Sequence, residues 1–267
     1  MTEPSKNPVL FVGAGPGDPN LITVAGRDAL ASADLVLYAG SLVSQDMLEW
    51  CPPGCRTISS AGLNLERIVE TLAQAHGQGQ KVVRLQTGDI SLYGALPEQL
   101  AALAQRGIPW RIIPGVTAAF AAAAALGLSY TLPEVCQSLI FTRTGGRTPM
   151  PPGEDLAALA AHGCSLAVYL SAALGPEVTE ALVSAYGAES PVAVVQRAAW
   201  PDEKILWTTA GDLVSALDRE GIGRQALILA GPAVAALQDG YSGGRQSKLY
   251  DGKFSHGWRQ GEDGEDA

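Results

Sequence analysis

The chain has 267 residues and a formal net charge of −9 at pH 7, with 47% hydrophobic and 17% charged residues. A chain of this length and apolar content can bury the core of one large domain or two modest ones. Its acidic balance disfavours nucleic acid as a partner, because phosphate binding requires clustered Lys and Arg, and it leaves recognition of any anionic substrate to local arginines.

Apolar runs suited to buried strands alternate with helical patterns, which predicts an α/β fold with mostly parallel sheets covered by helices. The expected strands are Val9–Val12, Leu35–Tyr38, Lys81–Gln86, Trp110–Ile113, Ser138–Thr142, Ser165–Leu170, Pro191–Arg197, Lys204–Thr209 and Gln225–Ala230. The expected helices are about Val24–Ala33, Leu65–His76, Pro97–Arg106, Thr117–Leu126, Leu156–Ala161, Pro176–Tyr186 and Gly211–Glu220. The short link Ala198–Glu203 suits an antiparallel hairpin rather than a crossover.

Two α/β domains are predicted, over residues 1–116 and 117–240. The second contains a long irregular loop, Gly145–Glu154, and loops of this length are often functional. Beyond Gly240 the composition changes, and residues 241–267 are expected to form a tail. Three aromatic residues recur there every four positions and are predicted to cover an apolar patch on the subunit or at a dimer contact, whereas the acidic end after Gln260 is predicted to be disordered. The aromatic residues are Tyr250, Phe254 and Trp258.

The stretch Val9–Gly26 combines a buried strand, three glycines at two-residue intervals and a helical pattern from about Thr23. This order is how an open α/β sheet brings backbone close to a ligand, although a simple tight turn is the alternative. Asp18 stands where a dinucleotide fingerprint needs its third glycine, and the lysine of a phosphate-binding loop is missing. The turn therefore predicts close approach to a ligand other than a pyrophosphate.

Two further strands end in glycine-bearing loops. Gly88–Ile90 follows one expected strand, and Pro114–Ala118 follows another. If these strands are parallel, both loops share one sheet edge with the turn at Gly13–Gly17, where open α/β folds bind ligands. Thr117 and Ala118 would then present backbone N–H groups at a helix start. A turn with a helix cap would explain each loop alone, but the three together favour a shared site.

Metal, secretion and membrane signals are weak throughout. The cysteines (Cys51, Cys55, Cys136 and Cys164) lack zinc-site spacing and the three histidines are scattered, so free thiols and no metal are expected. The amino terminus lacks the basic and apolar regions of a signal peptide. The longest low-polarity run, Val116–Leu128, is shorter than a membrane span. These features predict a soluble, cytoplasmic protein.

The chain also lacks a Gly-x-Ser-x-Gly nucleophile elbow. A sequence without metal, thiol or triad signals suits a transfer reaction governed by positioning. Methyl transfer from a sulfonium is such a reaction, because its donor is already activated and the protein chiefly aligns donor and acceptor.

Five stretches in chain order resemble the tetrapyrrole methyltransferase family: VGAGPGDPNLITVAG, VVRLQTGDISLYG, IIPGVTAAFAAAAALG, FTRTGGRTP and QRAAWPDEKI. The similarity covers about Val9–Ala230. It implies a homodimer in which S-adenosyl-methionine binds in a trough between two α/β domains. The GRTP and WPDEK segments further imply methylation of precorrin-4 at C11, in the corrin (vitamin B12) pathway.

The resemblance implies a donor site built from both domains. Pro16 would line it, and the residues around the methionine end would be Gly88, Asp89, Ile90 and Tyr93. Polar groups of the donor would meet Thr117 and Ala118. In the second domain the residues in contact with the adenosine would be Leu170, Ala198 and Ala230.

The implied substrate is an amphipathic macrocycle that carries several carboxylates. Arg143 and Arg147 would pair with them bidentately, unless both are simply exposed loop arginines. This chain reads Gly-Asp-Ile where the family usually has Gly-Asp-Pro, and no acidic residue follows Tyr38 closely. Asp89 is therefore the remaining local carboxylate and the candidate catalytic group. Alternatively, the electron-rich ring carbon requires orientation alone.

Other substrates and classes stay open at this stage. The near alternatives are methylation of uroporphyrinogen III, of another corrin carbon or of a cobalt-containing precorrin-4. A nicotinamide oxidoreductase would need the helix to open at the third glycine, which this sequence does not allow. A non-catalytic carrier would bind the macrocycle without the methyl donor.

Overall fold

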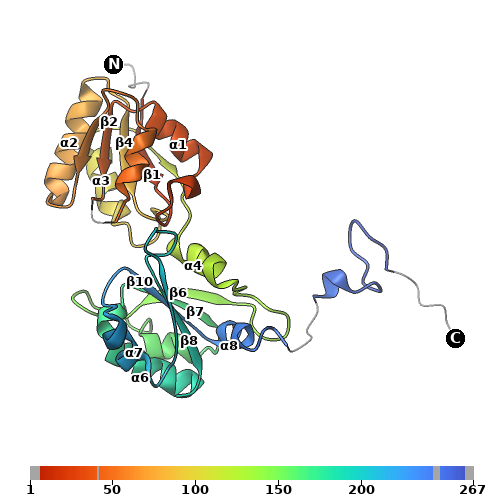
Figure 1. Ribbon diagram of the computed structural model, residues 1–267. Coiled ribbons are helices and arrows are strands. Elements are labelled where there is room, and N and C mark those ends of the chain that lie inside the picture. The colour runs from red at the N-terminus through yellow and green to blue at the C-terminus, as the bar shows by residue number, and fades with distance from the viewer. Residues whose placement is uncertain (1–6, 41, 243–246, 262–267) are drawn as a thin grey trace. The chain divides into compact units, whose positions relative to one another are not determined.

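The computed structural model describes residues 7–40, 42–242 and 247–261 (Figure 1). Two compact units make up the chain, one of Met1–Ala121 with Arg197–Glu203 and one of Ala122–Gln196 with Lys204–Ala267. The division falls within helix α4, Ala118–Leu126. The domain boundary between residues 116 and 117 stays a prediction.

The first unit contains a five-stranded sheet in the order β3-β2-β4-β1-β5, in which every pair of neighbours is parallel. Four strands match the predicted apolar runs, and three of them, the strands between Val9 and Gln86, are buried on both faces and therefore read as continuous apolar segments. The edge strand β3 was not predicted, since its sequence RTIS has a single apolar residue and is largely exposed. The strands are β1 Val9–Gly13, β2 Leu35–Tyr38, β3 Arg56–Ser59, β4 Val82–Gln86 and β5 Trp110–Ile113.

Helices cover both faces of this sheet (Figure 1). Helix α1, Val24–Ala31, packs on one face, where Leu30 is fully buried. Helices α2, Leu65–Gly77, and α3, Leu96–Gln105, pack on the other face, around Phe11. The sheet is therefore a doubly covered layer whose loops emerge only at its two ends.

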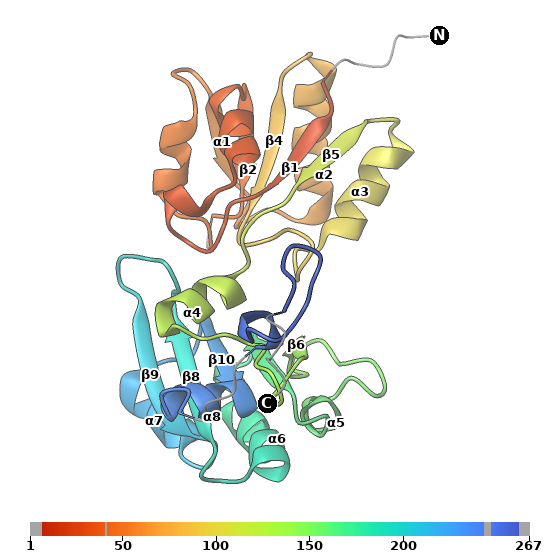
Figure 2. The same cartoon turned by 90° about the vertical axis from the view of Figure 1, so that its right-hand side faces the viewer.

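The second unit has a mixed sheet in the order β6-β7-β10-β8-β9. Only β6 and β7 pair in parallel, and the other neighbours are antiparallel. The predicted hairpin between β8 and β9 is confirmed (Figure 2). Because of this hairpin, β9 runs opposite to β8. The connection through α7 then returns the chain so that β10 runs in the same direction as β9, and β10 is therefore antiparallel to both its neighbours, β7 and β8. The strands are β6 Leu139–Arg143, β7 Ser165–Tyr169, β8 Pro191–Gln196, β9 Lys204–Thr209 and β10 Ala226–Ala230.

The core of the second unit lies between this sheet and three helices, around Leu166, Leu182 and Leu213. A further helix, α8 Pro232–Gln238, packs against β7, β8 and β10 and was not predicted, because its short apolar sequence directly follows a strand. The three helices of the core are α5 Leu156–Ala160, α6 Gly175–Tyr186 and α7 Leu213–Glu220. Short 3-10 helices lie at Pro19–Leu21, Gln45–Trp50, Ala172–Leu174 and Lys248–Tyr250.

Two surface expectations have different outcomes. The four cysteines are free thiols, as predicted, and two of them are buried.

The tail after Gly240 was the second expectation. In the tail, Tyr250 is 76% exposed and Trp258 is 97% exposed, and their predicted packing on a subunit or at a dimer contact stays a prediction. The disorder predicted after Gln260 concerns mainly residues 262–267, which lie outside the described residues. Across the described part of the chain, no helix is both long and apolar enough to cross a bilayer.

Candidate functional site

Three glycine-bearing loops meet at one edge of the first sheet, as the sequence predicted. Because β4, β1 and β5 are parallel neighbours, the loops that follow them emerge side by side. Gly15 and Gly88 form two backbone hydrogen bonds, of 3.2 Å from the Gly15 N–H and 2.7 Å from the Gly88 N–H. The loops after β1 and β4 are thus joined as a short antiparallel bridge.

The glycines are required because backbone packs directly on backbone. A Cβ placed on Gly115 would lie 2.1 Å from the carbonyl oxygen of Gly88 and 2.8 Å from the Cα of Gly13. A Cβ on Gly13 would lie 2.7 Å from Gly115 Cα. No side chain fits at these distances, and backbone atoms cannot rotate away. Close approach explains these glycines better than turn flexibility alone.

The loops after β1 and β4 also leave the sheet toward opposite faces. β1 leads to α1, whereas β4 leads to α3 on the other face. Adjacent parallel strands whose connections diverge in this way form a topological switch point, where open α/β sheets bind ligands. This topology marks the edge as the strongest site candidate in the first unit.

Asp89 ties two of these loops together. Its Oδ2 accepts a hydrogen bond from the Gly115 N–H at 2.9 Å, and its Oδ1 accepts from the Ser91 N–H at 2.9 Å and from the Ser91 hydroxyl. Partial burial raises the pKa of Asp89, but the hydrogen bonds from Ser91 and Gly115 outweigh burial and bring the pKa below its ordinary value. A carboxylate held ionised by three donors is suited to fixing loops and poorly suited to accepting a proton.

The other predicted residues of this loop differ in what they expose. Ile90 is 1% exposed, so its side chain packs inside the unit and does not face solvent. Tyr93 is 44% exposed and has a positive φ of 56°, which is uncommon for a non-glycine residue. Strained backbone of this kind concentrates at binding sites.

Pro16 lies in the glycine turn under an aromatic residue that sequence reasoning did not single out. The indole Nε1 of Trp200 donates a hydrogen bond to the Pro16 carbonyl at 2.9 Å. A Cβ on Gly17 would lie 2.3 Å from Trp200 Cδ1 and 2.5 Å from its Nε1, so the five-membered ring of the indole packs directly against the turn. Arg197 stacks over the same ring at 4.0 Å and pairs with Asp202 at 2.6 Å. In the sequence Trp200 stood out only as part of the WPDEK segment, which does not indicate this contact.

The remaining predicted residues of the first unit lie next to these loops. Thr117 is 8% exposed and directly precedes α4, which begins at Ala118. Both residues therefore stand at a helix start after the Pro114–Gly115 turn, as predicted. Ala198 is 6% exposed and follows β8 in the hairpin tip that belongs with this unit.

In the second unit the parallel pair β6 and β7 brings two predicted segments to one edge. Leu170 directly follows β7, is 67% exposed and has a positive φ of 56°. The loop after β6 is tied to it, because the Thr144 N–H donates to the Ser171 hydroxyl at 2.7 Å. An exposed, strained apolar residue at a strand end is a binding-site feature.

Ala230 does not share this edge. It pairs with Leu166, four residues before Leu170 along β7, which corresponds to about 13 Å at the rise of a strand. It is also 1% exposed. The topology therefore separates Ala230 from Leu170, because β10 is antiparallel to β7 where the sequence favoured a parallel strand.

The two predicted substrate arginines have different surroundings. The Arg143 guanidinium donates to three carbonyl oxygens of its own loop, those of Thr144, Thr148 and Pro149, at 3.0–3.2 Å. It therefore shapes this loop. Arg147, at the exposed tip, forms no hydrogen bond or ion pair with any residue that the structure describes. Its five N–H donors are available to an anion.

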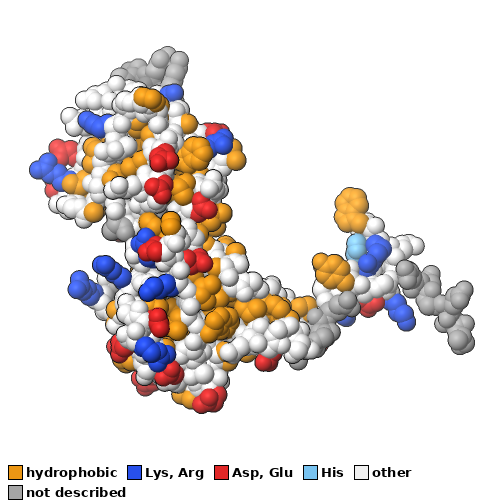
Figure 3. All heavy atoms as spheres, viewed as in Figure 1, with side chains coloured by type: hydrophobic (Ala, Val, Ile, Leu, Met, Phe, Trp, Pro, Cys, Tyr) orange, Lys and Arg blue, Asp and Glu red, His pale blue; other side chains and the backbone are white. Residues whose placement is uncertain are grey.

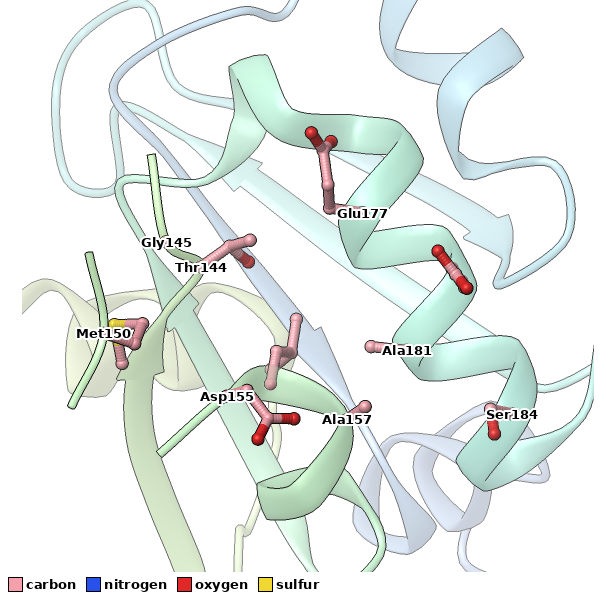
Figure 4. Close-up of a pocket in the computed structure, with 10 residues that line it drawn as sticks. Thr144, Gly145, Met150, Asp155, Ala157, Glu177, Ala181 and Ser184 are labelled. Carbon is pink, nitrogen blue, oxygen red and sulfur yellow. The ribbon is translucent and has the colours of Figure 1, made fainter. Parts of the chain in front are cut away.

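A hollow of about 420 Å³ lies between this loop, α5 and α6 (Figure 4). Its lining includes three carboxylates, from Asp155, Glu177 and Glu180. Figure 4 shows Asp155 and Glu177 directed away from one another, so they do not form a cation cage. An acidic lining would repel a polycarboxylate, which makes this hollow a poor candidate for an anionic substrate.

The chain is similar to known proteins over most of its length. A family model described as Tetrapyrrole (Corrin/Porphyrin) Methylases matches residues 8–214. A precorrin-4 C(11)-methyltransferase from Pseudomonas aeruginosa is 48% identical, over 95% of this chain and 99% of the relative.

Two solved structures share the fold at different distances. A cobalt precorrin-4 methyltransferase of cobalamin biosynthesis superimposes with a TM-score of 0.82 at 46% identity, over 85% of this chain and 95% of that one. A uroporphyrin-III C-methyltransferase from Thermus thermophilus, solved with S-adenosyl homocysteine, superimposes with a TM-score of 0.69 at 25% identity, over 85% of this chain and 93% of that one.

Replacing Gly115 by Ala should force the three loops apart. Because the new methyl group would meet backbone atoms, we expect the free energy of unfolding to fall by about 1–3 kcal/mol, as for other overpacked sites. Urea denaturation measures the change. The control is Gly62→Ala, whose added Cβ meets no atom within 4 Å. Equal stability of the two variants would disprove the close packing of these loops.

Replacing Asp89 by Asn should change how stability depends on pH. The folded pKa of Asp89 is depressed, so its stabilising effect is present above the unfolded pKa and is lost as pH falls through the folded pKa. We expect Asp89→Asn to be less stable than the wild type at pH 7, and the difference to shrink below about pH 4. Denaturation midpoints between pH 7 and 3 measure this. Asp28→Asn, at an exposed carboxylate on α1, serves as control. If the stability difference between Asp89→Asn and the wild type did not change with pH, the hydrogen bonds of the ionised Asp89 would not be what stabilises these loops.

Proposed function

Because the chain belongs to the tetrapyrrole (corrin/porphyrin) methylase family, we propose that it transfers a methyl group from S-adenosyl-methionine to C11 of precorrin-4. The products are precorrin-5 and S-adenosyl-homocysteine. The observation that carries the proposal is the joined set of glycine loops after β1, β4 and β5, at the edge where an open α/β sheet binds its ligand. Near-full-length similarity to precorrin-4 methyltransferases supports the choice of substrate.

The loops of the first unit fit such a donor. When bound, S-adenosyl-methionine supplies a methyl group already activated on a sulfonium. Gly88, Asp89 and Ile90 would hold its methionine end, with the buried side chain of Ile90 anchoring this loop in the core. The exposed ring of Tyr93 would lie beside it, and Pro16 would line the turn. An ionised Asp89 near a cationic donor is also electrostatically favourable.

Further donor contacts would come from the helix start and from the second sheet. Thr117 and Ala118 stand at the beginning of α4, where backbone N–H groups meet polar ligand atoms. Leu170 and Ala198 follow strands of the second sheet, and we propose both as adenosine contacts. Ala230 is left out of this proposal, because it lies at the other end of β7 from Leu170.

Alignment of donor and acceptor would account for most of the catalysis. Three hydrogen-bond donors occupy Asp89 and keep its pKa low, which disfavours it as a general base. The methyl transfer needs no acid to activate its donor. Holding donor and acceptor in line at about 3 Å supplies a large rate effect by itself. We therefore assign Asp89 a positioning role.

Substrate carboxylates would be met by arginine. Arg147 is exposed and has all its donors available, so it is the stronger candidate for direct contact. Arg143 would act mainly by shaping the loop that carries Arg147. The whole chain is acidic, so recognition of a polyacid depends on such local cations. Figure 3 shows Lys and Arg side chains spread over the face in view among acidic and apolar ones.

Assembly as a homodimer and location in the cytoplasm are part of the same proposal. The three aromatic residues of the tail are exposed in the single chain and are available for a subunit contact. Sedimentation equilibrium of the purified protein measures the mass directly. A monomer at micromolar concentration would refute the dimer without affecting the proposed chemistry.

The activity is tested by incubating the purified protein with labelled S-adenosyl-methionine and precorrin-4. We expect label at C11, and a parallel reaction with cobalt-precorrin-4 determines which form is preferred. Uroporphyrinogen III serves as the control macrocycle, because relatives of this fold methylate it. Label on uroporphyrinogen III alone, or on no macrocycle at all, would refute the proposed reaction.

Replacing Arg147 by Ala should weaken substrate binding without affecting the donor. The lost bidentate pair is worth about 1.5–3 kcal/mol, which corresponds to an increase in KM of tenfold or more. Calorimetry with S-adenosyl-homocysteine should give an unchanged Kd. The control is Arg219→Ala, at an exposed arginine on α7. Equal loss of substrate and donor affinity would point to misfolding and remove Arg147 from the site.

A further inference from the structure

A buried cation lies directly beneath the donor loop. Arg84, in the middle of β4, is 4% exposed. Its guanidinium donates to Gln99 Oε1 at 3.0 Å, to the Leu37 carbonyl at 3.2 Å and to the Ser60 hydroxyl at 3.0 Å. Among the described residues, no carboxylate pairs with it. Burial lowers the pKa of Arg84 to about 10. An uncompensated buried charge costs free energy, so its presence calls for a role other than stability.

Arg84 fixes the orientation of a neighbouring amide. Gln99, on α3, is 3% exposed, and its amide has one accepting and one donating end. A guanidinium only donates, so it holds the oxygen end of the Gln99 amide toward itself. The nitrogen end then points to the loop and donates to the Ala95 carbonyl at 2.9 Å. Arg84 therefore acts on the loop through Gln99.

A second glutamine holds the preceding peptide. Gln86, two residues after Arg84 on β4, is 8% exposed and donates to the Gly94 carbonyl at 2.7 Å. Two consecutive loop carbonyls, those of Gly94 and Ala95, are thus held from below by buried amides. We call Arg84, Gln86 and Gln99 the buried brace.

The loop above the brace is strained. Tyr93 and Ala95 both have left-handed backbone, with φ of 56° and 46°. A Cβ on Gly94 would lie 2.3 Å from the Ile90 carbonyl oxygen, so the loop closes tightly on itself. Non-glycine residues keep such conformations only where surrounding contacts enforce them. The Gln86 hydrogen bond holds the carbonyl of Gly94, which lies between Tyr93 and Ala95, and the Gln99 hydrogen bond holds the carbonyl of Ala95 itself.

We propose that the buried brace is a positioning device that holds the 88–95 loop in its donor-binding conformation and so sets the affinity for S-adenosyl-methionine. The proposal rests on the proposed function, because it takes this loop as the donor site. None of the three brace residues contacts the donor in this scheme. A purely structural core at these positions would be better served by apolar residues of similar size.

Gln99→Glu separates positioning from stability. A glutamate keeps the contact with Arg84 as an ion pair but cannot donate to the Ala95 carbonyl. We expect the variant to keep its fold and melting temperature, and to bind S-adenosyl-homocysteine about fivefold more weakly or worse in calorimetry. The matched control is Gln105→Glu, at an exposed position on the same helix, which should bind like the wild type. If Gln99→Glu fails to fold, Gln86→Leu removes the Gly94 contact with an apolar side chain and should show the same loss.

Hydrogen exchange tests the brace independently of any ligand. In Gln99→Glu we expect faster amide exchange confined to residues 89–96, and no change in Gln105→Glu. If Gln99→Glu binds S-adenosyl-homocysteine as tightly as the wild type and its 89–96 amides exchange at the wild-type rate, the proposed role of the buried brace is wrong. If the wild-type protein itself does not bind S-adenosyl-homocysteine, the proposed function fails. The exchange result then decides alone whether the brace orders the loop.

Discussion

Direct backbone contact between three loops is the constraint on which the first unit depends. Gly13 and Gly115 pack so closely that neither has room for a Cβ, and Gly15 and Gly88 are joined by two backbone hydrogen bonds. Parallel strands β4, β1 and β5 bring the loops to one edge, and glycine allows them to touch. Asp89 then fixes the β4 loop against the β5 loop. Much of the proposed donor site is consequently backbone, and the side chains around it mainly hold that backbone in place.

The two sheets contribute in different ways because their topologies differ. The first is a parallel sheet with a switch point, so its ligand-facing loops all come from one edge. The second contains a hairpin that reverses the chain, so only part of its strands end at the edge that carries Leu170. This difference explains why Leu170, which follows β7, and Ala230, which ends β10, lie at opposite edges of the second sheet.

Much of the fold followed from sequence pattern. The predicted apolar runs all became strands, and most of these are buried strands, which carry continuous apolar sequence, whereas β5 and β9 are largely exposed. The pattern missed β3, whose sequence RTIS is largely exposed, and it could not reveal the direction of β10. The meeting of the three glycine loops at one sheet edge was predictable, because loops that follow parallel strands emerge at the same edge. The contact of Trp200 with Pro16 was not, since 184 residues separate them and no local pattern encodes it.

The position of Trp200 against Gly17 has a consequence for how this chain can evolve. A methyl group at position 17 and an indole at position 200 cannot occupy the same space, since 2.3 Å separates their atoms. The two sites are therefore epistatic. A side chain at 17 becomes tolerable only after the indole has been exchanged for something smaller, so one order of substitution is open and the reverse order passes through a defective intermediate.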